Sequence, residues 1–240
     1  MMAATTAGRQ LTEAHRLAQA RLADDLRRIL GPAWRLLDPT DLDGTFAAWL
    51  RIVQPAIAAQ HTRSAKLAAD YLAAFRLLEV GETGPLVLAD PLHAEQVVTS
   101  LTVTGPATVK SAMSRGLPIG AAMVRGEVAS TRAAMRLATN GGRDTILRTT
   151  DTDRTAQGWA RVTSGKPCAF CAMLASRGAV YDAAGDFKCH DGCHCTAEPR
   201  YRPDSPLPPG SERWADAWQQ AVQDPGDTKI VFRQLVEAQR

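Results

Sequence analysis

All five cysteines of this 240-residue chain lie in one short stretch, CAFCAMLASRGAVYDAAGDFKCHDGCHC, which begins at Cys168 and ends at Cys195. Two of the five histidines, His190 and His194, lie in the same stretch. So many thiol and imidazole groups in so short a segment favour a local fold organised around a metal ion. An odd number of clustered cysteines is a poorer basis for a disulfide framework.

The spacing of these residues defines the expected metal site. Cys168 and Cys171 form a C-x-x-C pair, a spacing that lets two thiolates reach one ion. After eighteen intervening residues, His190 and Cys193 form an H-x-x-C step that mirrors the first pair. The pattern C-x2-C-x18-H-x2-C is close to that of zinc ribbons and supplies four ligands for tetrahedral Zn²⁺. Because four protein ligands leave no open position for a substrate water, we expect the zinc to be structural.

Three further side chains of the stretch, Cys189, His194 and Cys195, are not needed for this ligand set. Either Cys195 or Cys189 can replace one of the four expected ligands, since neighbours along an extended chain point apart. Disulfides and a redox-active dithiol are the alternatives to a metal site. The apolar residues of the stretch are expected to form a small core around the ion: Phe170, Met173, Leu174, Val180, Tyr181 and Phe187.

Hydrophobic residues recur at steps of three and four along the first 80 residues. The pattern predicts three amphipathic helices, over residues 11–30, 46–57 and 67–80. Gly31 and Pro32 should end the first helix, Pro55 should kink the second, and Gly81 should end the third.

The next segment is ambiguous by periodicity. Residues 97–104, rich in Val and Thr, fit either a short strand or a strained helix end. Pro106 and Pro118 each stand where a first helical residue is expected, and the second of these helices should run to the pair Gly141 and Gly142. The buried stripe of that helix is expected to consist of Val124, Val128, Thr131 and Met135.

Positive charge is concentrated in the middle of the chain, although the net charge is only +3. Between Lys110 and Lys166 there are ten Lys or Arg residues and four acidic residues. Arg125, Arg132 and Arg136 line up on one face of the helix expected after residue 118. The simple interpretation is a solvated helix face. The more specific interpretation is that these arginines form a ridge that contacts DNA phosphates weakly and without sequence preference.

These patterns predict a mainly α fold with a small α+β zinc-binding module. We expect a helical region over residues 1–150, a zinc-binding module of Cys-x-x-Cys and His-x-x-Cys-x-Cys type over residues 151–200, and a Pro-rich extended linker with a helical tail over residues 201–240. The apolar residues expected to pack the tail are Trp214, Trp218, Ile230, Val231, Leu235 and Val236.

No stretch has the apolar length of a signal peptide or of a membrane span. We therefore expect a protein of a reducing cytosol, without membrane contact. No P-loop, G-x-S-x-G or dinucleotide-binding pattern is present in the sequence.

Residues 158–199 resemble the C-terminal signature of phage minor head proteins related to the Mu F protein, in particular the form found in tailed phages of actinobacteria. The helical stretch SLTVTGPATVKSAMSRG is also similar to those proteins, with a less specific pattern. Cys189 is an addition to the usual ending of the signature. In that family a C-x-x-C pair is followed by a Gly-containing turn and a His-x-x-Cys-x-Cys ending, matched here by Cys168, Cys171, Gly178, His190, Cys193 and Cys195.

The resemblance implies a minor capsid protein that acts in phage head morphogenesis and is not an enzyme. Such proteins are associated with the portal vertex inside the head, so the portal protein is the implied partner, with major capsid or scaffold protein as further candidates. The implied location is the capsid interior of the virion, and the host cytoplasm during assembly. Packaged DNA would then lie near the basic middle of the chain.

A zinc-dependent enzyme acting on nucleic acid is the alternative. His93 and Glu95 match H-x-E, and Cys168 and Cys171 match P-C-x-x-C, which together form the signature of zinc deaminases. The 71 residues between the two halves exceed the usual connection, and the match leaves the histidine and cysteines of the second half unused. A nuclease is a related alternative, because CHDGCHC offers metal ligands, but no acidic or general-base set of suitable spacing accompanies them.

Overall fold

The computed structural model describes residues 6–178, 181, 187–203, 205–208 and 210–239, and over these residues the fold is mainly helical with one small sheet. This confirms the expected fold class. The elements, in chain order, are α1 (Thr6–Trp34), α2 (Leu42–Val80), α3 (Ala94–Thr102), the π-helical turn η1 (Val103–Ala107), α4 (Thr108–Ser114), α5 (Ile119–Thr152), β1 (Trp159–Val162), α6 (Ala169–Ser176), β2 (Thr196–Pro199), α7 (Glu212–Gln223) and α8 (Thr228–Ala238).

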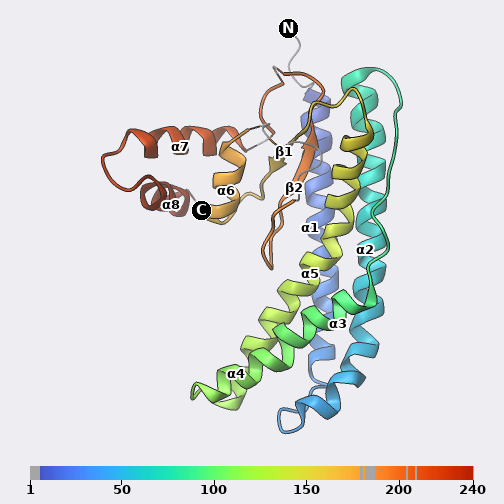
Figure 1. Ribbon diagram of the computed structural model, residues 1–240, viewed down its shortest axis with the longest axis vertical. Coiled ribbons are helices and arrows are strands. Elements are labelled where there is room, and N and C mark those ends of the chain that lie inside the picture. Colours follow the sequence, from blue (N-terminus) through green and yellow to red (C-terminus); the bar gives the residue numbers. More distant parts are fainter. Residues whose placement is uncertain (1–5, 179–180, 182–186, 204, 209, 240) are drawn as a thin grey trace.

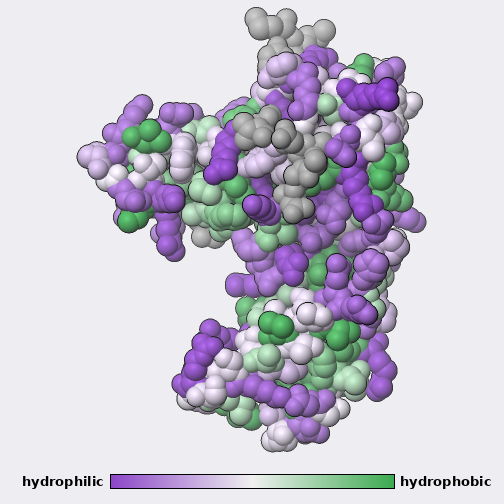
Figure 2. All heavy atoms as spheres, in the orientation of Figure 1, coloured by the Kyte–Doolittle hydropathy of each residue, from purple (hydrophilic) through white to green (hydrophobic). Residues whose placement is uncertain are grey.

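Three long helices, α1, α2 and α5, lie side by side along the long axis of the molecule, and α6, α7 and α8 form an arm at one side (Figure 1). The arm and the lower end of the bundle leave an open concave side between them (Figure 1). Figure 2 shows that the face of the molecule in view is largely hydrophilic, with smaller hydrophobic patches that include some over the lower bundle. None of the helices in the described part of the chain has the length and hydropathy that a membrane span requires.

The second and third expected helices are one continuous helix, α2, and the expected break between them is wrong. Pro55 lies inside this helix. The apolar pattern fades after residue 57 because Gln60, His61 and Ser64 are polar but buried. Ser64 donates to the side chain of Gln19 at 2.7 Å and accepts the amide of Gly142 on α5 at 2.9 Å. Hydrogen bonds between helices therefore replace hydrophobic contacts at this level of the bundle.

Two expected helix ends are also wrong. Helix α1 continues through Gly31 and Pro32 to Trp34, and α5 continues through Gly141 and Gly142 to Thr152. The glycine pair allows close packing instead of ending the helix. A Cβ atom on Gly141 would collide with the carbonyl oxygen of His61 on α2. Glycine is required there because the two backbones nearly touch.

The expected buried stripe of α5 is wrong in half of its residues. Val124 is 60% exposed and Val128 is 45% exposed, whereas Met135 is buried. The buried face instead carries mostly small residues that fit between α1, α2 and α4, namely Ala122, Gly126, Ser130, Ala133, Ala134, Leu137 and Ala138.

The Val- and Thr-rich segment is helical and ends in a π-helical turn, so it is not a strand. Helix α3 passes into the π-helical turn η1, which contains Pro106, so Pro106 is not the first residue of a helix as expected. Proline lacks an N–H and cannot make the regular helical hydrogen bond, which is a common cause of such turns. Pro118 stands at the N-cap of α5, one residue before the helix begins.

The cysteine-rich stretch does not form an isolated module. Strands β1 and β2 pair antiparallel, with Trp159 opposite Pro199 and Val162 opposite Thr196. Their core is continuous with α2 and α5, and this shared hydrophobic cluster contains Ala68, Tyr71, Leu72, Phe75, Ile146, Leu147, Trp159, Cys171, Phe187, Cys193, Cys195, Ala197 and Tyr201.

The expected core of the stretch is only partly correct. Leu174 and Phe187 are buried, and Tyr181 stacks on Trp159 at 4.5 Å between ring centroids. Phe170, however, is 42% exposed. Met173 packs in the arm, against the cluster formed by α6, α7 and α8, and Val180 lies outside the described residues.

The helical tail folds back onto α6. Trp214 on α7 is fully buried, and its indole N–H donates to Thr163 at 3.1 Å. On α8, Val236 is buried as expected, but Ile230 is exposed and Phe232 is buried. Of the four residues expected to pack on α8, Val231, Leu235 and Val236 therefore do so and Ile230 does not.

Candidate metal centre

Cys168 and Cys171 are positioned by the start of α6. Cys168 is the N-cap residue, with extended backbone angles, and its sulfur accepts the backbone amide of Cys171 at 3.4 Å. An N-cap sulfur that accepts an amide is held as a thiolate by the unpaired N–H groups of the helix end. The helix start thus directs both sulfurs of the C-x-x-C pair to one side.

The second half of the site is a tight turn before β2. The amide of Cys193 donates to the carbonyl oxygen of His190 at 3.1 Å, which closes the turn. Gly192 in the turn has a φ of 79°, a left-handed conformation that favours glycine. The turn brings His190 and Cys193 back toward α6.

The sulfur and nitrogen atoms converge around Cys171. The Cys168 sulfur lies 2.9 Å from Nε2 of His190, and the Cys171 sulfur lies 3.5 Å from that of Cys193. Two overlapping groups have their ligand atoms within 4.8 Å of one another: Cys168, Cys171 and His190, and Cys171, Cys193 and Cys195. Sulfur ligands of a tetrahedral zinc lie about 3.8 Å apart, so the cluster has the right size to hold a metal ion such as zinc.

The orientation of His190 fits a ligand role. Its Nδ1 lies 2.9 Å from the carbonyl oxygen of Asp191, to which an Nδ1–H group donates. In the neutral imidazole this leaves Nε2 without a proton and directed at the cysteines, an arrangement typical of metal-bound histidines.

The electrostatics of the cluster favour the thiolate form of Cys168 and Cys193. Hydrogen bonding from Cys171 lowers the pKa of Cys168 to about 5. Hydrogen bonds from Cys171 and Cys195 lower the pKa of Cys193, whereas donation to Cys168 and Cys193 raises the pKa of Cys171. Thiolates are the form that binds a metal ion.

The cluster is buried on one side and open on the other. Cys171, Cys193 and Cys195 are buried, Cys168 is half-buried and His190 is exposed. A cavity of about 240 Å³ lies on the open side and is bordered by Arg132 and Lys166 as well as by the cluster.

The remaining candidate cysteine lies apart. The sulfur of Cys189 faces Oδ1 of Asn140 at 3.6 Å and Nη1 of Arg143 at 3.7 Å. Cys189 belongs to neither ligand group. His194 belongs to neither ligand group, and it borders both the cavity at the cluster and a second one between α1 and α5.

Helix α5 holds the turn through contacts that the sequence analysis missed. Arg143 donates to the carbonyl oxygens of Cys193 at 2.6 Å and Cys195 at 3.0 Å. Arg161 on β1 donates to the carbonyl oxygen of Lys188 at 2.7 Å. No spacing rule marks these arginines, because their neighbours in space are 27 to 52 residues away.

The residues of the enzyme alternative lie elsewhere. His93 is the N-cap residue of α3 and Glu95 lies in its first turn, and both are exposed. Both border a cavity of about 870 Å³ between α3 and α5. Among the described residues, the histidine that joins Cys168 and Cys171 is His190.

The three candidate DNA-contacting arginines differ in their surroundings. Arg125 and Arg132 are exposed on α5. Arg136 is partly buried and forms an ion pair with Asp191 at 2.6 Å. Two of the three side chains are therefore exposed, and the third holds the metal-binding turn.

A family model described as VG15 protein matches residues 6–221. No curated protein and no solved structure matches the chain. The matched segment contains the long helices, the cysteine cluster and α7. Because this match covers most of the sequence, the chain belongs to the VG15 protein family.

Proposed function

We propose that this protein is a minor capsid component that acts in phage head morphogenesis, docked at or near the portal inside the head. The observation that carries the proposal is the resemblance of residues 158–199 to the signature of Mu F-related minor head proteins. The cysteines and the histidine of that signature converge into one cluster in the fold, which supports the resemblance. The portal protein is the proposed partner, with major capsid or scaffold protein as further candidates.

The cluster is proposed to hold a structural Zn²⁺ through Cys168, Cys171, His190 and Cys193. Thiolate and imidazole donors in this number and spacing fit tetrahedral zinc, and zinc supplies folding energy at such sites. Burial of Cys171 and Cys193 and the contacts of the turn with α5 support a structural role. The ion would join the C-terminal part of the chain to the helical bundle.

Weak, sequence-independent DNA contact by the basic face of α5 is a subsidiary proposal. Exposure of Arg125 and Arg132 supports it. Phosphate binding of this kind needs no base contacts.

Protease protection of virions tests the location. Purified virions should contain the chain, and added protease should digest it only after the heads are opened. Co-expression with the portal protein of the same phage tests the partner, and the two proteins should purify together. Absence of the chain from virions, or its digestion on intact heads, would overturn the location inside the head.

A further inference from the structure

Four arginines are buried in the described part of the chain, and they fall into two pairs by their partners. Away from the cysteine cluster, Arg76 pairs with Asp153 at 2.7 Å and Arg200 pairs with Glu198 at 3.3 Å. Beside the cluster, neither buried arginine forms an ion pair with a carboxylate of the described residues. The four are Arg76, Arg143, Arg161 and Arg200.

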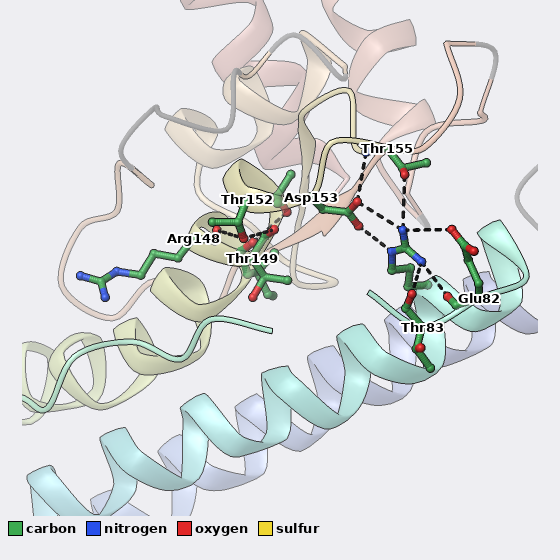
Figure 3. Close-up of polar contacts among 10 residues, drawn as sticks. Glu82, Thr83, Arg148, Thr149, Thr152, Asp153 and Thr155 are labelled. Carbon is green, nitrogen blue, oxygen red and sulfur yellow. Dashed lines mark hydrogen bonds and ion pairs between the residues drawn. The ribbon is translucent and has the colours of Figure 1, made fainter. Parts of the chain in front are cut away.

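The Arg76 site shows what a fully matched buried guanidinium looks like in this protein. Asp153 supplies the counter-charge, and the carbonyl oxygens of Glu82 and Thr83 accept further hydrogen bonds at 2.8 and 2.7 Å. Figure 3 shows these groups and Thr155 gathered around the guanidinium. Both its charge and its N–H groups are thus satisfied.

Arg143 has hydrogen-bond partners, but none of them is a carboxylate in the part of the chain that the structure describes. It is 2% exposed and donates to the carbonyl oxygens of Cys193 and Cys195 and to the side chain of Asn140. Its Nη1 lies 3.7 Å from the sulfur of Cys189. Carbonyl oxygens satisfy N–H groups but do not neutralise a charge, so a buried cation remains.

Arg161 does not have a full set of hydrogen bonds from the residues that the structure describes. It is 1% exposed, and its Nη2 donates to the carbonyl oxygen of Lys188, just before Cys189. Its Nε and Nη1 are buried and have no hydrogen-bond partner among the described residues. The guanidinium carbon lies 3.9 Å from the ring centroid of Phe187, and that of Arg143 lies 5.2 Å from the same centroid. Both cations therefore flank the segment that carries the ligands.

We propose that Arg143 and Arg161 are the counter-charges of an anionic metal–thiolate centre, and that Arg143 also positions the segment from Cys193 to Cys195 against α5. The inference rests on the proposed metal site. A divalent ion with three thiolates and one imidazole carries one negative charge, and with four thiolates it carries two. Either centre supplies the negative charge that no carboxylate of the described residues provides to the two buried cations. Such neighbours of a metal site set its affinity and geometry.

Zinc affinity of the purified full chain tests the proposal, measured by competition with a chromophoric chelator. Arg143→Met and Arg161→Met should each raise the Kd for zinc by about tenfold or more, as is typical for residues that support metal ligands. Arg161→Lys keeps the charge and should stay closer to the wild-type Kd. The matched control is Arg76→Met, which removes a buried arginine with its own carboxylate and should leave the Kd unchanged.

Cobalt substitution separates positioning from charge. Arg143→Lys keeps the charge but loses the guanidinium N–H groups that donate to both carbonyl oxygens. It should therefore shift the visible absorption bands of bound Co²⁺. Arg161→Lys should leave these bands unchanged. Wild-type Kd values in both Met variants would refute the role of the arginines. If the Met variants do not fold, weakening of zinc binding by about tenfold or more in Arg161→Lys would refute the charge argument. A wild-type chain that binds no zinc would instead refute the metal site itself.

Discussion

The backbone amide of Gly192 donates a hydrogen bond of 3.2 Å to the carbonyl oxygen of Arg132, in the middle of α5. One turn further along this helix, Arg136 pairs with Asp191. The metal-binding turn is therefore docked on the helical bundle through both backbone and side-chain contacts. Stability of the turn and stability of the bundle should be coupled for this reason.

The first prediction concerns Gly192. Alanine there should lower the free energy of unfolding by about 1–2 kcal/mol, because a φ of 79° disfavours a side chain. Its Cβ would also lie 3.2 Å from Cγ of Arg132. Urea unfolding of the zinc-saturated protein measures the change. Gly165→Ala is the control, since a Cβ there meets nothing within 4 Å, and it should change the value by less than about 0.5 kcal/mol.

The second prediction concerns the metal. Protein purified under reducing conditions should contain about one zinc per chain. Cys171→Ser should abolish binding and lower the melting temperature, because Cys171 belongs to both ligand groups. Cys189→Ser should keep the zinc, since Cys189 belongs to neither group. Elemental analysis that finds no metal in the wild-type protein would contradict the prediction.

The same measurement distinguishes the possible fourth ligands. With the proposed ligand set, His190→Ala should lose most of the zinc, because Nε2 of His190 lies 2.9 Å from the Cys168 sulfur. Cys195→Ser should retain it. The opposite result would assign four cysteines as ligands and exclude His190.

The third prediction concerns the contact between α2 and α5. Gly141→Ala should destabilise the fold by about 1–3 kcal/mol, because the added methyl group meets the His61 carbonyl oxygen and forces the helices apart. Gly120→Ala, in the same helix, has open space around it and should stabilise the helix by up to about 1 kcal/mol. Thermal unfolding of both variants gives the comparison, and equal effects would show that the helices do not pack as described.

The fourth prediction concerns pH. Burial lowers the pKa of His15 to about 4, although a hydrogen bond to the backbone of Leu67 partly opposes the shift. Between about pH 6.5 and pH 4 the unfolded chain binds a proton that the folded chain does not. The contribution of His15 to the free energy of unfolding is therefore complete above about pH 6.5. It falls by about 3 kcal/mol as the pH drops to about 4.

His15→Phe isolates this contribution. The aromatic ring can still stack on Tyr71, whose centroid lies 4.5 Å from that of His15. The difference in unfolding free energy between wild type and variant should change across this pH range in favour of the variant at low pH. Contributions from the acid-labile cysteine cluster are common to both proteins and cancel. A difference independent of pH would show that His15 is accessible to protons in the folded protein.

The fifth prediction concerns DNA. Because Arg125 and Arg132 are exposed, Arg125→Gln with Arg132→Gln should weaken retention of duplex DNA at low salt, and wild-type binding should itself fade toward physiological salt. Arg9→Gln with Arg233→Gln removes two charges from α1 and α8 and serves as the control. Unchanged DNA retention with failed particle assembly would assign the α5 face to a protein interface.

The fold class follows from the local pattern of the sequence. Helical periodicity and the C-x2-C and H-x2-C spacings involve residues a few positions apart, so they could be read without knowledge of the fold. The break expected near residue 60 was wrong because Gln60, His61 and Ser64 are buried by helices from elsewhere in the chain. Periodicity cannot mark a buried face whose residues are polar.

By itself, the sequence determined which side chains were available to a metal ion and that they would lie near one another. Only the tertiary structure decided that Cys195 joins Cys171 and Cys193 while Cys189 turns toward α5. It also decided that Val124 and Val128 face outward, and that Arg143 is buried beside the cluster. The physical reason is that burial and charge compensation depend on which surfaces meet across long separations in the chain, whereas spacing and helical period depend only on near neighbours.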